Sequence, residues 1–334
     1  MAKTNWGILS TANIGRKAMI PALKASKLAD IRAVASRDLD NARQFADELQ
    51  IEHAYGSYQE LLEDDEINAI YIPLPNHLHK EWSIRAARAG KHVLCEKPLA
   101  LTAEDCEEMK ATADAHGVLL MESFMYRHHP RILAAREMVK TGKIGELKII
   151  NAGFTFWLAD ENDIRNQPEM GGGAVMDVGC YCINISRLMA GREPQVVQAR
   201  AEWAFSGVDD KLVGMLDFGG GLMAHFDCGF NMESRQECII AGTDGYLSLP
   251  RTFTPGLEET MIEEQKGKKS LLTHRFDGVD EYRLIAEDFM RSIPTGKPPY
   301  DANDAAANLS VIQACLQSAR QNGSPVVIKT PLNQ

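Results

Sequence analysis

The chain has 334 residues, of which 45% are hydrophobic, and a formal net charge of −10. This length and composition allow a large buried core and predict two domains, because one ordinary domain is shorter. The negative charge repels phosphate backbones and anionic lipids, so nucleic acids and membrane surfaces are disfavoured as partners.

Other features of the sequence indicate a cytoplasmic protein. No apolar run approaches the roughly 20 residues that cross a bilayer, and the first six residues lack the apolar core of a secretory signal. The seven cysteines are scattered and odd in number, which indicates free thiols in a reducing compartment. Cys180 and Cys182 are too close for a usual zinc pair, and no metal site is expected.

Residues 1–122 alternate short apolar runs with helical patterns. The predicted strands are 6–10, 31–36, 69–73, 92–95 and 118–121, and the predicted helices are 14–25, 38–49, 77–89 and 102–116. Alternation of this kind is typical of a doubly wound parallel sheet with helices on both faces. We therefore predict an α/β dinucleotide-binding domain over residues 1–122.

The pattern changes after about residue 123. Predicted helices at 125–141 and 174–189 flank a long predicted strand, 147–157. Further strands follow without helices between them, at 196–205, 212–218, 222–228, 234–241 and 246–249; two helices (281–292, 304–321) and a short strand (325–328) end the chain. Strands in direct succession indicate a mostly antiparallel sheet. We predict a second, α+β domain over residues 123–334 with a large open sheet.

The first predicted strand ends in a turn of small residues. A dinucleotide fingerprint carries glycines where this chain has Ser10, Ala12 and Gly15. Small residues still let the backbone approach a pyrophosphate at a helix N-terminus. The predicted cofactor contacts in this turn are Ser10, Thr11, Ala12, Asn13, Ile14 and Gly15. An ordinary strand-to-helix turn is the alternative.

The second predicted strand ends in Ser36 and Arg37. An acidic residue holds the ribose hydroxyls of NAD at this point, whereas an arginine binds a 2′-phosphate. We therefore predict NADP as the cofactor, with NAD less favoured. The alternatives are a solvated Arg37 and, for Asp38, the cap of the next helix.

Two more strand ends carry polar residues at the same predicted edge of the sheet. Pro73, Asn76 and His79 follow the third strand and are predicted to contact the ribose or nicotinamide. Asn76 could instead cap the helix that follows.

Glu96 and Lys97, which are also predicted cofactor contacts, follow the fourth strand and precede Pro98, which keeps Lys97 out of helical geometry. Lys97 is predicted to donate to a substrate hydroxyl and to stabilise a neighbouring phenolate. A surface lysine paired with Glu96 is the alternative.

Asp177 and Tyr181 lie four residues apart at a helix start, just after three glycines at 171–173. The spacing places both on one helix face, and the glycines would let the backbone approach a ligand. The alternative is a core tyrosine with an aspartate favoured by the helix dipole. Tyr126 and Arg165 are further predicted substrate contacts.

Together these segments resemble the glucose–fructose oxidoreductase/inositol dehydrogenase (Gfo/Idh/MocA) family over nearly the whole chain. The carrying residues are the turn at 10–15, Ser36 with Arg37, Asn76 with His79, the run 96–98 and the segment 171–181. The resemblance implies an N-terminal Rossmann domain and a C-terminal domain whose open sheet joins subunits in a homodimer or homotetramer. It assigns the family's lysine to Lys97, its substrate-facing aspartate to Asp177 and its catalytic position to Tyr181.

A tyrosine at that position resembles the branch that holds NADP-dependent aldose 1-dehydrogenases, dihydrodiol dehydrogenases and glucose–fructose oxidoreductase. The chain begins just before its first predicted strand, without the N-terminal arm of the last, so we expect a freely exchanging cofactor.

We therefore expect an NADP-dependent sugar dehydrogenase that moves a hydride between nicotinamide and a carbinol, with a lactone as product for an aldose. Tyr181 would accept the proton, Lys97 would stabilise the phenolate and Asp177 would orient the sugar. A keto-sugar or dicarbonyl reductase, a dihydrodiol dehydrogenase and a non-catalytic dinucleotide sensor are the alternatives.

Overall fold

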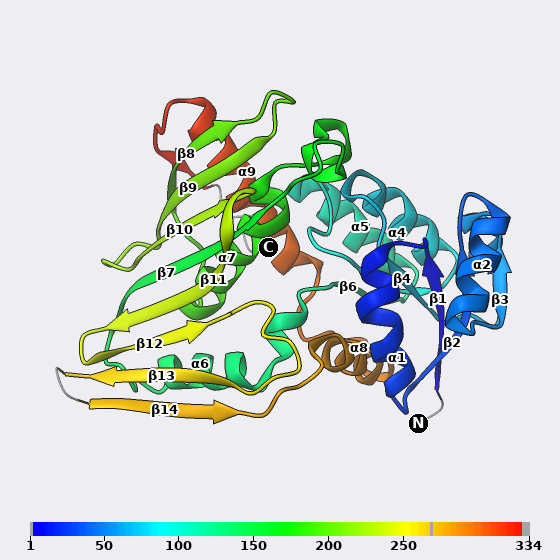
Figure 1. The fold of residues 1–334 in the computed structure, drawn as a ribbon, viewed down its shortest axis with the longest axis horizontal. Helices are drawn as coiled ribbons and strands as arrows, with labels where there is room; N and C mark the ends of the chain where they lie inside the picture. The colour runs from blue at the N-terminus through cyan, green and yellow to red at the C-terminus, as the bar shows by residue number, and fades with distance from the viewer. Residues whose placement is uncertain (1–2, 268–269, 329–334) are drawn as a thin grey trace. The chain divides into compact units, whose positions relative to one another are not determined.

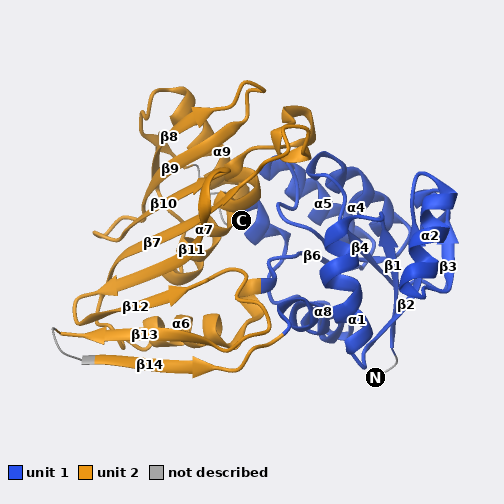
Figure 2. Ribbon diagram, in the orientation of Figure 1, with its two compact units in different colours: residues 1–125, 280–306 blue, residues 126–279, 307–334 orange. Residues whose placement is uncertain are grey.

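The computed structural model describes residues 3–267 and 270–328, which form two compact units (Figure 2). The first unit comprises residues 1–125 and 280–306, and the second comprises residues 126–279 and 307–334. The sequence prediction had assigned 280–306 to the second domain. In the structure the helix in this segment, α8 (Glu281–Ser292), packs against α1 (Ile20–Ala25) of the first unit. Trp6 joins the contact, and its indole Nε1 donates to Met290 Sδ at 3.4 Å.

The first unit is built on a parallel sheet of six strands in the order β3-β2-β1-β4-β5-β6 (Figure 1). The strands are β1 (Thr4–Leu9), β2 (Ala29–Ala35), β3 (His53–Tyr55), β4 (Ala69–Ile72), β5 (His92–Cys95) and β6 (Leu120–Glu122). The helices that accompany them are α2 (Leu39–Leu49), α3 (Tyr58–Leu62), α4 (His79–Arg88) and α5 (Ala103–Ala115). The predicted doubly wound sheet is confirmed.

Side-chain caps explain where several of these helices begin. The predicted cap Asp38 accepts from Asn41 N at 2.8 Å, and Thr102 accepts from Asp105 N at 3.1 Å. Each cap satisfies a backbone donor that the first helical turn leaves open. Strand β3 and helix α3 were not predicted, because β3 has only three residues and α3 only five.

The register of the sheet places four strand ends side by side. Leu9 pairs with Ala35, Ile8 with Tyr71, and Ile72 with Cys95. Because the strands are parallel, the segments that follow β2, β1, β4 and β5 leave the sheet at one edge. The sequence analysis predicts that the cofactor binds at this edge.

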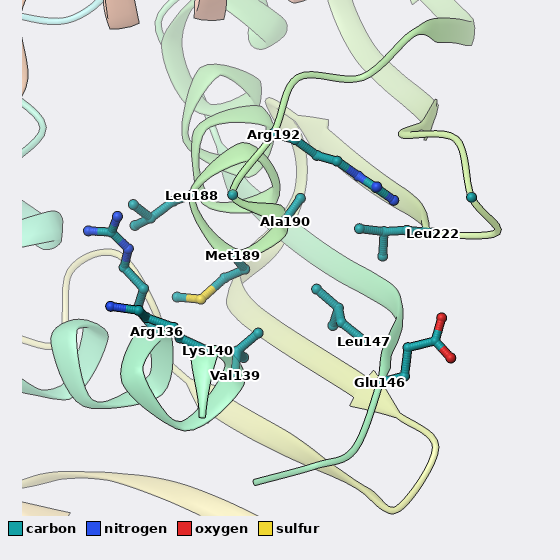
Figure 3. Close-up of a pocket in the computed structure, with 12 residues that line it drawn as sticks. Arg136, Val139, Lys140, Glu146, Leu147, Leu188, Met189, Ala190, Arg192 and Leu222 are labelled. Atoms are coloured by element: carbon teal, nitrogen blue, oxygen red, sulfur yellow. The ribbon is translucent and has the colours of Figure 1, made fainter. Parts of the chain in front are cut away.

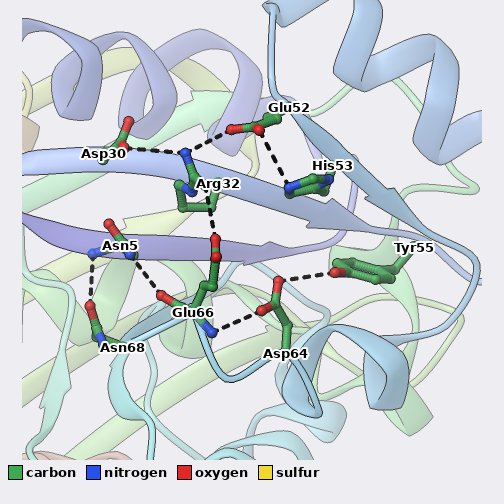
Figure 4. Close-up of polar contacts among 9 residues, drawn as sticks. All are labelled: Asn5, Asp30, Arg32, Glu52, His53, Tyr55, Asp64, Glu66 and Asn68. Atoms are coloured by element: carbon green, nitrogen blue, oxygen red, sulfur yellow. Dashed lines mark hydrogen bonds and ion pairs between the residues drawn. The ribbon is translucent and has the colours of Figure 1, made fainter.

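The opposite edge of the same sheet carries a polar network (Figure 4). Arg32 of β2 forms ion pairs with Glu52 at 2.7 Å, Glu66 at 2.9 Å and Asp30 at 3.7 Å. Asn5 of β1 donates to Glu66 O at 2.8 Å. These contacts tie together the segments that enter the sheet, and they lie away from the predicted cofactor edge.

The second unit is built on a sheet of nine strands in the order β14-β13-β12-β11-β7-β10-β9-β8-β15 (Figure 1). The strands are β7 (Leu147–Trp157), β8 (Val196–Trp203), β9 (Asp209–Asp217), β10 (Met223–Gly229), β11 (Asn231–Gly242), β12 (Gly245–Pro250), β13 (Thr260–Lys266), β14 (Ser270–Phe276) and β15 (Val326–Val327). All neighbours are antiparallel except β7 and β10, which confirms the predicted mostly antiparallel sheet. Strands β13 and β14 were missed by the sequence analysis.

The helices of this unit are α6 (Pro130–Lys140), α7 (Cys180–Ala190) and α9 (Ala302–Arg320), the last shared with the first unit. Helix α7 packs against β7 and β10, and α6 packs against β13. The predicted helix 125–141 is divided: Met125–His128 is a 3₁₀ turn, and His129 is extended (φ −68°, ψ 132°). The break follows from Pro130, which disfavours helical geometry in the residue before it.

Among the described residues no helix is long and apolar enough to span a membrane. All seven cysteines are buried free thiols.

Candidate functional site

The turn after β1 has the backbone form of a dinucleotide-binding turn although its first glycine is replaced. Ser10 has φ +119°, a conformation that favours glycine. Its amide donates to Ala35 O at 2.9 Å, and its hydroxyl accepts from Ala12 N at 2.9 Å. The helix that follows starts with a π-helical turn, Gly15–Met19, whose N-cap residue Ile14 makes no side-chain capping bond. Backbone donors at such a helix start can bind a pyrophosphate.

The end of β2 offers a cation for a 2′-phosphate. Arg37 is exposed and forms no ion pair with any residue in the described part of the chain. Arg16, another cation near this turn, is already engaged: it pairs with Glu48 and stacks on the Phe45 ring at 4.7 Å. Arg37 is therefore the guanidinium that remains available at this edge.

The segment after β4 places its predicted residues differently. Pro73 is buried, and its ring lies 3.8 Å from the point where a Cβ on Gly15 would stand, so it borders the first turn. Asn76 is partly exposed at the start of a 3₁₀ turn, Asn76–Leu78. His79 is fully buried and does not present its ring at the surface of this edge.

His79 instead joins two loops. Its Nδ1 lies 2.8 Å from Pro98 O and its Nε2 lies 2.7 Å from Leu74 O. Burial lowers the pKa of His79 to about 4, so the ring is neutral near pH 7. The structure thus gives His79 a supporting position under the loop of Lys97, whereas the sequence analysis expected a direct cofactor contact.

The loop that carries Lys97 is held on both sides of the lysine. Glu96 Oε1 accepts from Tyr71 OH at 2.7 Å, and Leu99 N donates to Glu122 Oε1 at 2.8 Å. The peptide bond between Lys97 and Pro98 is cis. Burial raises the pKa of Glu96, against the opposing effects of the Tyr71 bond and the Lys97 charge. Glu96 therefore anchors the loop, and Lys97 lies at the predicted edge of the sheet.

The second unit holds Tyr181 in a cluster of aromatic rings. Ring centroids of Phe154, Tyr126 and Phe253 lie 5.5, 5.7 and 5.4 Å from that of Tyr181. Tyr181 is only 5% exposed. Tyr126, predicted to contact substrate, is completely buried and donates its hydroxyl to Asn184 Oδ1 at 2.6 Å. The rings fix the orientation of Tyr181.

Asp177 and Arg165 form a charged group next to the same helix. Arg165 Nε lies 2.7 Å from Asp177 Oδ2, and Arg165 Nη1 lies 3.1 Å from Asp163 Oδ1. One guanidinium is thus shared by two carboxylates. The arrangement brings together Asp177 and Arg165, which the sequence analysis had named separately.

Contacts within the protein explain why glycine is required at positions 172 and 173. A Cβ on Gly172 would stand 2.3 Å from Arg165 O, so only glycine lets the Arg165 loop fold against the helix start. Gly173 has φ +116°, and a Cβ there would stand 2.3 Å from Asp209 Oδ1. The sequence analysis attributed these glycines to close approach of a ligand; the structure shows close approach of the protein's own backbone and side chains.

Asp209 is a residue that sequence reasoning missed. It is 2% exposed, and its Oδ2 accepts from Val175 N at 2.7 Å, at the start of the helical segment that carries Asp177 and Tyr181. Burial raises the pKa of Asp209 to about 7. It stands at the start of an ordinary strand sequence, so no local sequence motif indicates that Asp209 supports this helix.

Two cavities in the second unit lie apart from these residues. One of about 430 Å³ is lined by apolar side chains including Leu147, Met189 and Leu222, with Arg136 and Arg192 at its sides (Figure 3). The other, of about 680 Å³, lies over β8, β9 and β10. No predicted site residue lines either cavity. Within residues 3–267 and 270–328, no group of three or more His, Cys, Asp or Glu side chains could hold a metal ion.

Two family models match the chain. Residues 4–124 match the family described as "Oxidoreductase family, NAD-binding Rossmann fold", and residues 132–248 match the "GFO/IDH/MocA C-terminal domain".

Several characterised proteins are similar over almost the same length. D-xylose 1-dehydrogenase (NADP(+)) 2 of Haloferax volcanii is 39% identical over 94% of this chain and 97% of its own. A dTDP-3,4-didehydro-2,6-dideoxy-alpha-D-glucose 3-reductase of Actinomadura kijaniata is 33% identical over 94% of this chain and 95% of its own. The crystal structure of KijD10, a 3-ketoreductase from Actinomadura kijaniata, with NADP and TDP-benzene has a TM-score of 0.89. It is 31% identical, over 95% of this chain and 98% of that one.

Proposed function

Because the chain belongs to the Gfo/Idh/MocA family of oxidoreductases, we propose that it is an NADP-dependent dehydrogenase that oxidises the anomeric carbinol of an unphosphorylated aldose to a lactone. The observation that carries the proposal is the place of Lys97, in an anchored loop at the same sheet edge as the Ser10 turn and Arg37. Two of the similar proteins, the xylose dehydrogenase and KijD10, are named with NADP.

The residues at this edge fit NADP. The uncapped helix start after Ser10 would bind the pyrophosphate, and Arg37 would bind the 2′-phosphate. Bound NADP would supply the hydride acceptor at nicotinamide C4.

The protein's own part in the reaction is proton transfer and orientation. The Lys97 ammonium would stabilise Tyr181 as a phenolate, and this phenolate would accept the proton of the reacting hydroxyl as general base. Asp177, fixed by Arg165, would accept a hydrogen bond from a sugar hydroxyl. In the reverse direction the same groups would protonate a carbonyl.

The charge around Asp177 favours a neutral sugar over a nucleoside-diphosphate sugar. Segment 158–170 carries the acids Asp160, Glu161, Asp163 and Glu169 and one base, Arg165. Arg165 is already shared by Asp163 and Asp177. A diphosphate near this segment would meet uncompensated negative charge, whereas a free aldose would not.

The test is Tyr181→Phe, with turnover and NADPH binding measured separately. We expect a loss of kcat of roughly 100-fold or more, the range of a general base, while the Kd for NADPH changes less than about twofold. Turnover equal to wild type would remove Tyr181 from the mechanism.

A substrate panel separates the alternatives. We expect lactone formation from free aldoses with NADP, and lower kcat/KM with dTDP-linked keto-sugars and dihydrodiols. Preference for the keto-sugars would favour a 3-ketoreductase like the similar enzyme of Actinomadura kijaniata. NADP binding without turnover of any substrate would favour a sensor.

A further inference from the structure

The ring of Phe253 contacts each of the other three rings of the cluster, which are Tyr181, Tyr126 and Phe154. Its centroid lies 5.4 Å from Tyr181, 5.3 Å from Tyr126 and 5.3 Å from Phe154. The interplanar angles are 55°, 87° and 7°, so the ring stacks on Phe154 and meets Tyr126 edge-on. Phe253 is completely buried. A shift of Phe253 would therefore change the surface on which Tyr181 rests.

Phe253 follows a turn, Pro250–Thr252, whose backbone conformation is not favoured by its own residue types. Arg251 has φ +47°, a left-handed conformation that is unfavourable for a residue other than glycine, asparagine or aspartate. Thr252 is completely buried, and its hydroxyl donates to Leu249 O at 2.5 Å. Contacts from elsewhere must stabilise this conformation.

Arg131 supplies those contacts. Its Nη1 donates to Pro250 O at 2.8 Å and to the Thr260 hydroxyl, and its Nη2 donates to Arg251 O at 2.8 Å and Thr252 O at 3.1 Å. Three consecutive carbonyl groups thus meet one guanidinium, which is itself 0% exposed. The planar fork of arginine suits this arrangement, and the ammonium of lysine does not reproduce it.

The position of Arg131 has no explanation in its own helix. It is the second residue of α6, where the helix dipole disfavours a cation. The carbonyl groups of residues 250–252 give the charge its partners. Arg131 therefore stabilises the turn, and the turn determines where Phe253 lies.

We propose that Arg131 is a positioning residue for Tyr181. Its guanidinium holds the turn Pro250–Thr252, and this turn keeps the Phe253 ring in contact with the Tyr181 ring. The inference rests on the proposed function, because it assumes that the Tyr181 hydroxyl takes part in proton transfer. Displacement of a reacting group by about 1 Å can cost up to about 100-fold in rate.

The experiment uses Arg131→Lys, Phe253→Leu and the double variant in the full-length protein. The aldose with the highest turnover in the panel is the substrate, and NADPH fluorescence measures cofactor binding. We expect each single variant to lower kcat by roughly 10-fold, with the Kd for NADPH within about twofold of wild type. The double variant should be no worse than about the poorer single variant, because both changes act through one turn.

Phe226→Leu is the matched control. Phe226 is a buried phenylalanine of β10, 1% exposed, outside the Tyr181 cluster. It should lose stability as Phe253→Leu does, but its kcat should stay within about twofold of wild type.

Three outcomes would overturn the proposal: a kcat in Phe253→Leu no lower than in Phe226→Leu, losses that multiply in the double variant, or a loss confined to NADPH binding. If Arg131→Lys fails to fold, Phe253→Leu and Phe253→Met decide by the same comparison. Tyr181→Phe distinguishes a failure of the proposed function from a failure of the proposed role of Arg131. Full activity in that variant ends the proposed function, whereas an inactive Tyr181→Phe with an active Phe253→Leu ends only the role of Arg131.

Discussion

At the scale of single residues, Ser10 and Arg37 show how the cofactor edge tolerates unusual residue types. Ser10 adopts φ +119° and satisfies its own hydroxyl by accepting from Ala12 N, so a serine can stand where glycine is usual. Arg37 takes the place of the acid that would bind the hydroxyls of an NAD ribose. Serine at position 10 therefore preserves the conformation of the turn, whereas arginine at position 37 changes the expected cofactor from NAD to NADP.

Arg37→Asp should raise KM for NADP by roughly 10- to 100-fold and change KM for NAD by less than about threefold. The reason is the loss of a charge-assisted bond to the 2′-phosphate, worth about 1.5–3 kcal/mol. Steady-state kinetics with both cofactors measure the change. Arg43→Asp, an exposed arginine on α2, is the control and should leave the ratio of the two KM values unchanged. Equal losses with NADP and NAD in Arg37→Asp would show that the phosphate binds elsewhere.

Asp209 is a buried carboxylic acid that contributes a pH-dependent term to the stability of the protein. Its pKa is about 7 in the folded state and about 3.9 in an unfolded chain. Between these values the folded state retains the proton that the unfolded state has lost. The contribution of Asp209 to stability therefore falls as pH rises from about 4 to about 7 and is constant above.

Asp209→Asn should remove this dependence, because the amide can still accept from Val175 N but cannot ionise. The free energy of unfolding of the variant, relative to that of wild type, should therefore increase between pH 5 and pH 8, by at most about 3 kcal/mol. Urea unfolding at both values measures it, with the exposed carboxylate change Glu233→Gln as control. A difference between variant and wild type that does not vary with pH would contradict the assignment.

At the scale of elements, a helix of each unit that follows predicted site residues begins in the same way. Gly15–Met19 precedes α1 and Val175–Gly179 precedes α7, and both segments are π-helical. Such turns are rare in proteins and occur often at functional sites. In the second helix, Gly173 and Asp209 determine where the π-helical segment starts, so they also determine where Asp177 and Tyr181 lie.

Gly173→Ala and Gly191→Ala test this dependence at opposite ends of one helix. Both glycines have positive φ, +116° and +64°, but a Cβ on Gly191 meets nothing within 4 Å, whereas one on Gly173 meets Asp209. Gly191→Ala should cost about 1–2 kcal/mol of stability and leave kcat within about twofold. Gly173→Ala should cost more and should also lower kcat by roughly 10-fold or more. Equal kcat in the two variants would show that the helix start does not position the site.

At the scale of the whole molecule, one face of the nine-stranded sheet exposes apolar side chains. Ile149 and Met223 are paired across β7 and β10 and are 41% and 37% exposed, and Val213 on β9 is 52% exposed. Together they border the cavity of about 680 Å³. Exposed apolar groups of this kind often mark an interface, and we propose that this face joins subunits in a homodimer or homotetramer.

Val213→Arg should therefore reduce the molar mass measured by light scattering after size-exclusion chromatography, at an unchanged far-UV circular dichroism spectrum. A guanidinium in the centre of an interface is costly when it has no partner. Leu257→Arg, at an apolar residue 74% exposed and outside the sheet, is the control and should keep the wild-type mass. A wild-type protein that is monomeric at micromolar concentration would exclude the interface.

Periodicity and chain order were sufficient to predict most of the helices and strands, though not β3, α3, β13 or β14. They also predicted the edge of the first sheet at which the proposed cofactor residues lie. Alternation of strands and helices requires a parallel sheet, and in a parallel sheet the residues after Leu9, Ala35, Ile72 and Cys95 share an edge. Both facts depend on periodicity and chain order, which are local properties. The short elements β3 and α3 escaped because a few residues carry too little periodicity.

Which polar side chains hold the predicted site residues in place is visible only in the folded structure. His79 turned out to join two loops, Asp209 to cap a helix from a distant strand, and Arg131 to hold a turn about 120 residues away in the chain. Each of these contacts joins residues with no common sequence pattern. The physical reason is burial: a polar group removed from water must find a partner wherever the fold places one, and chain order does not encode that place.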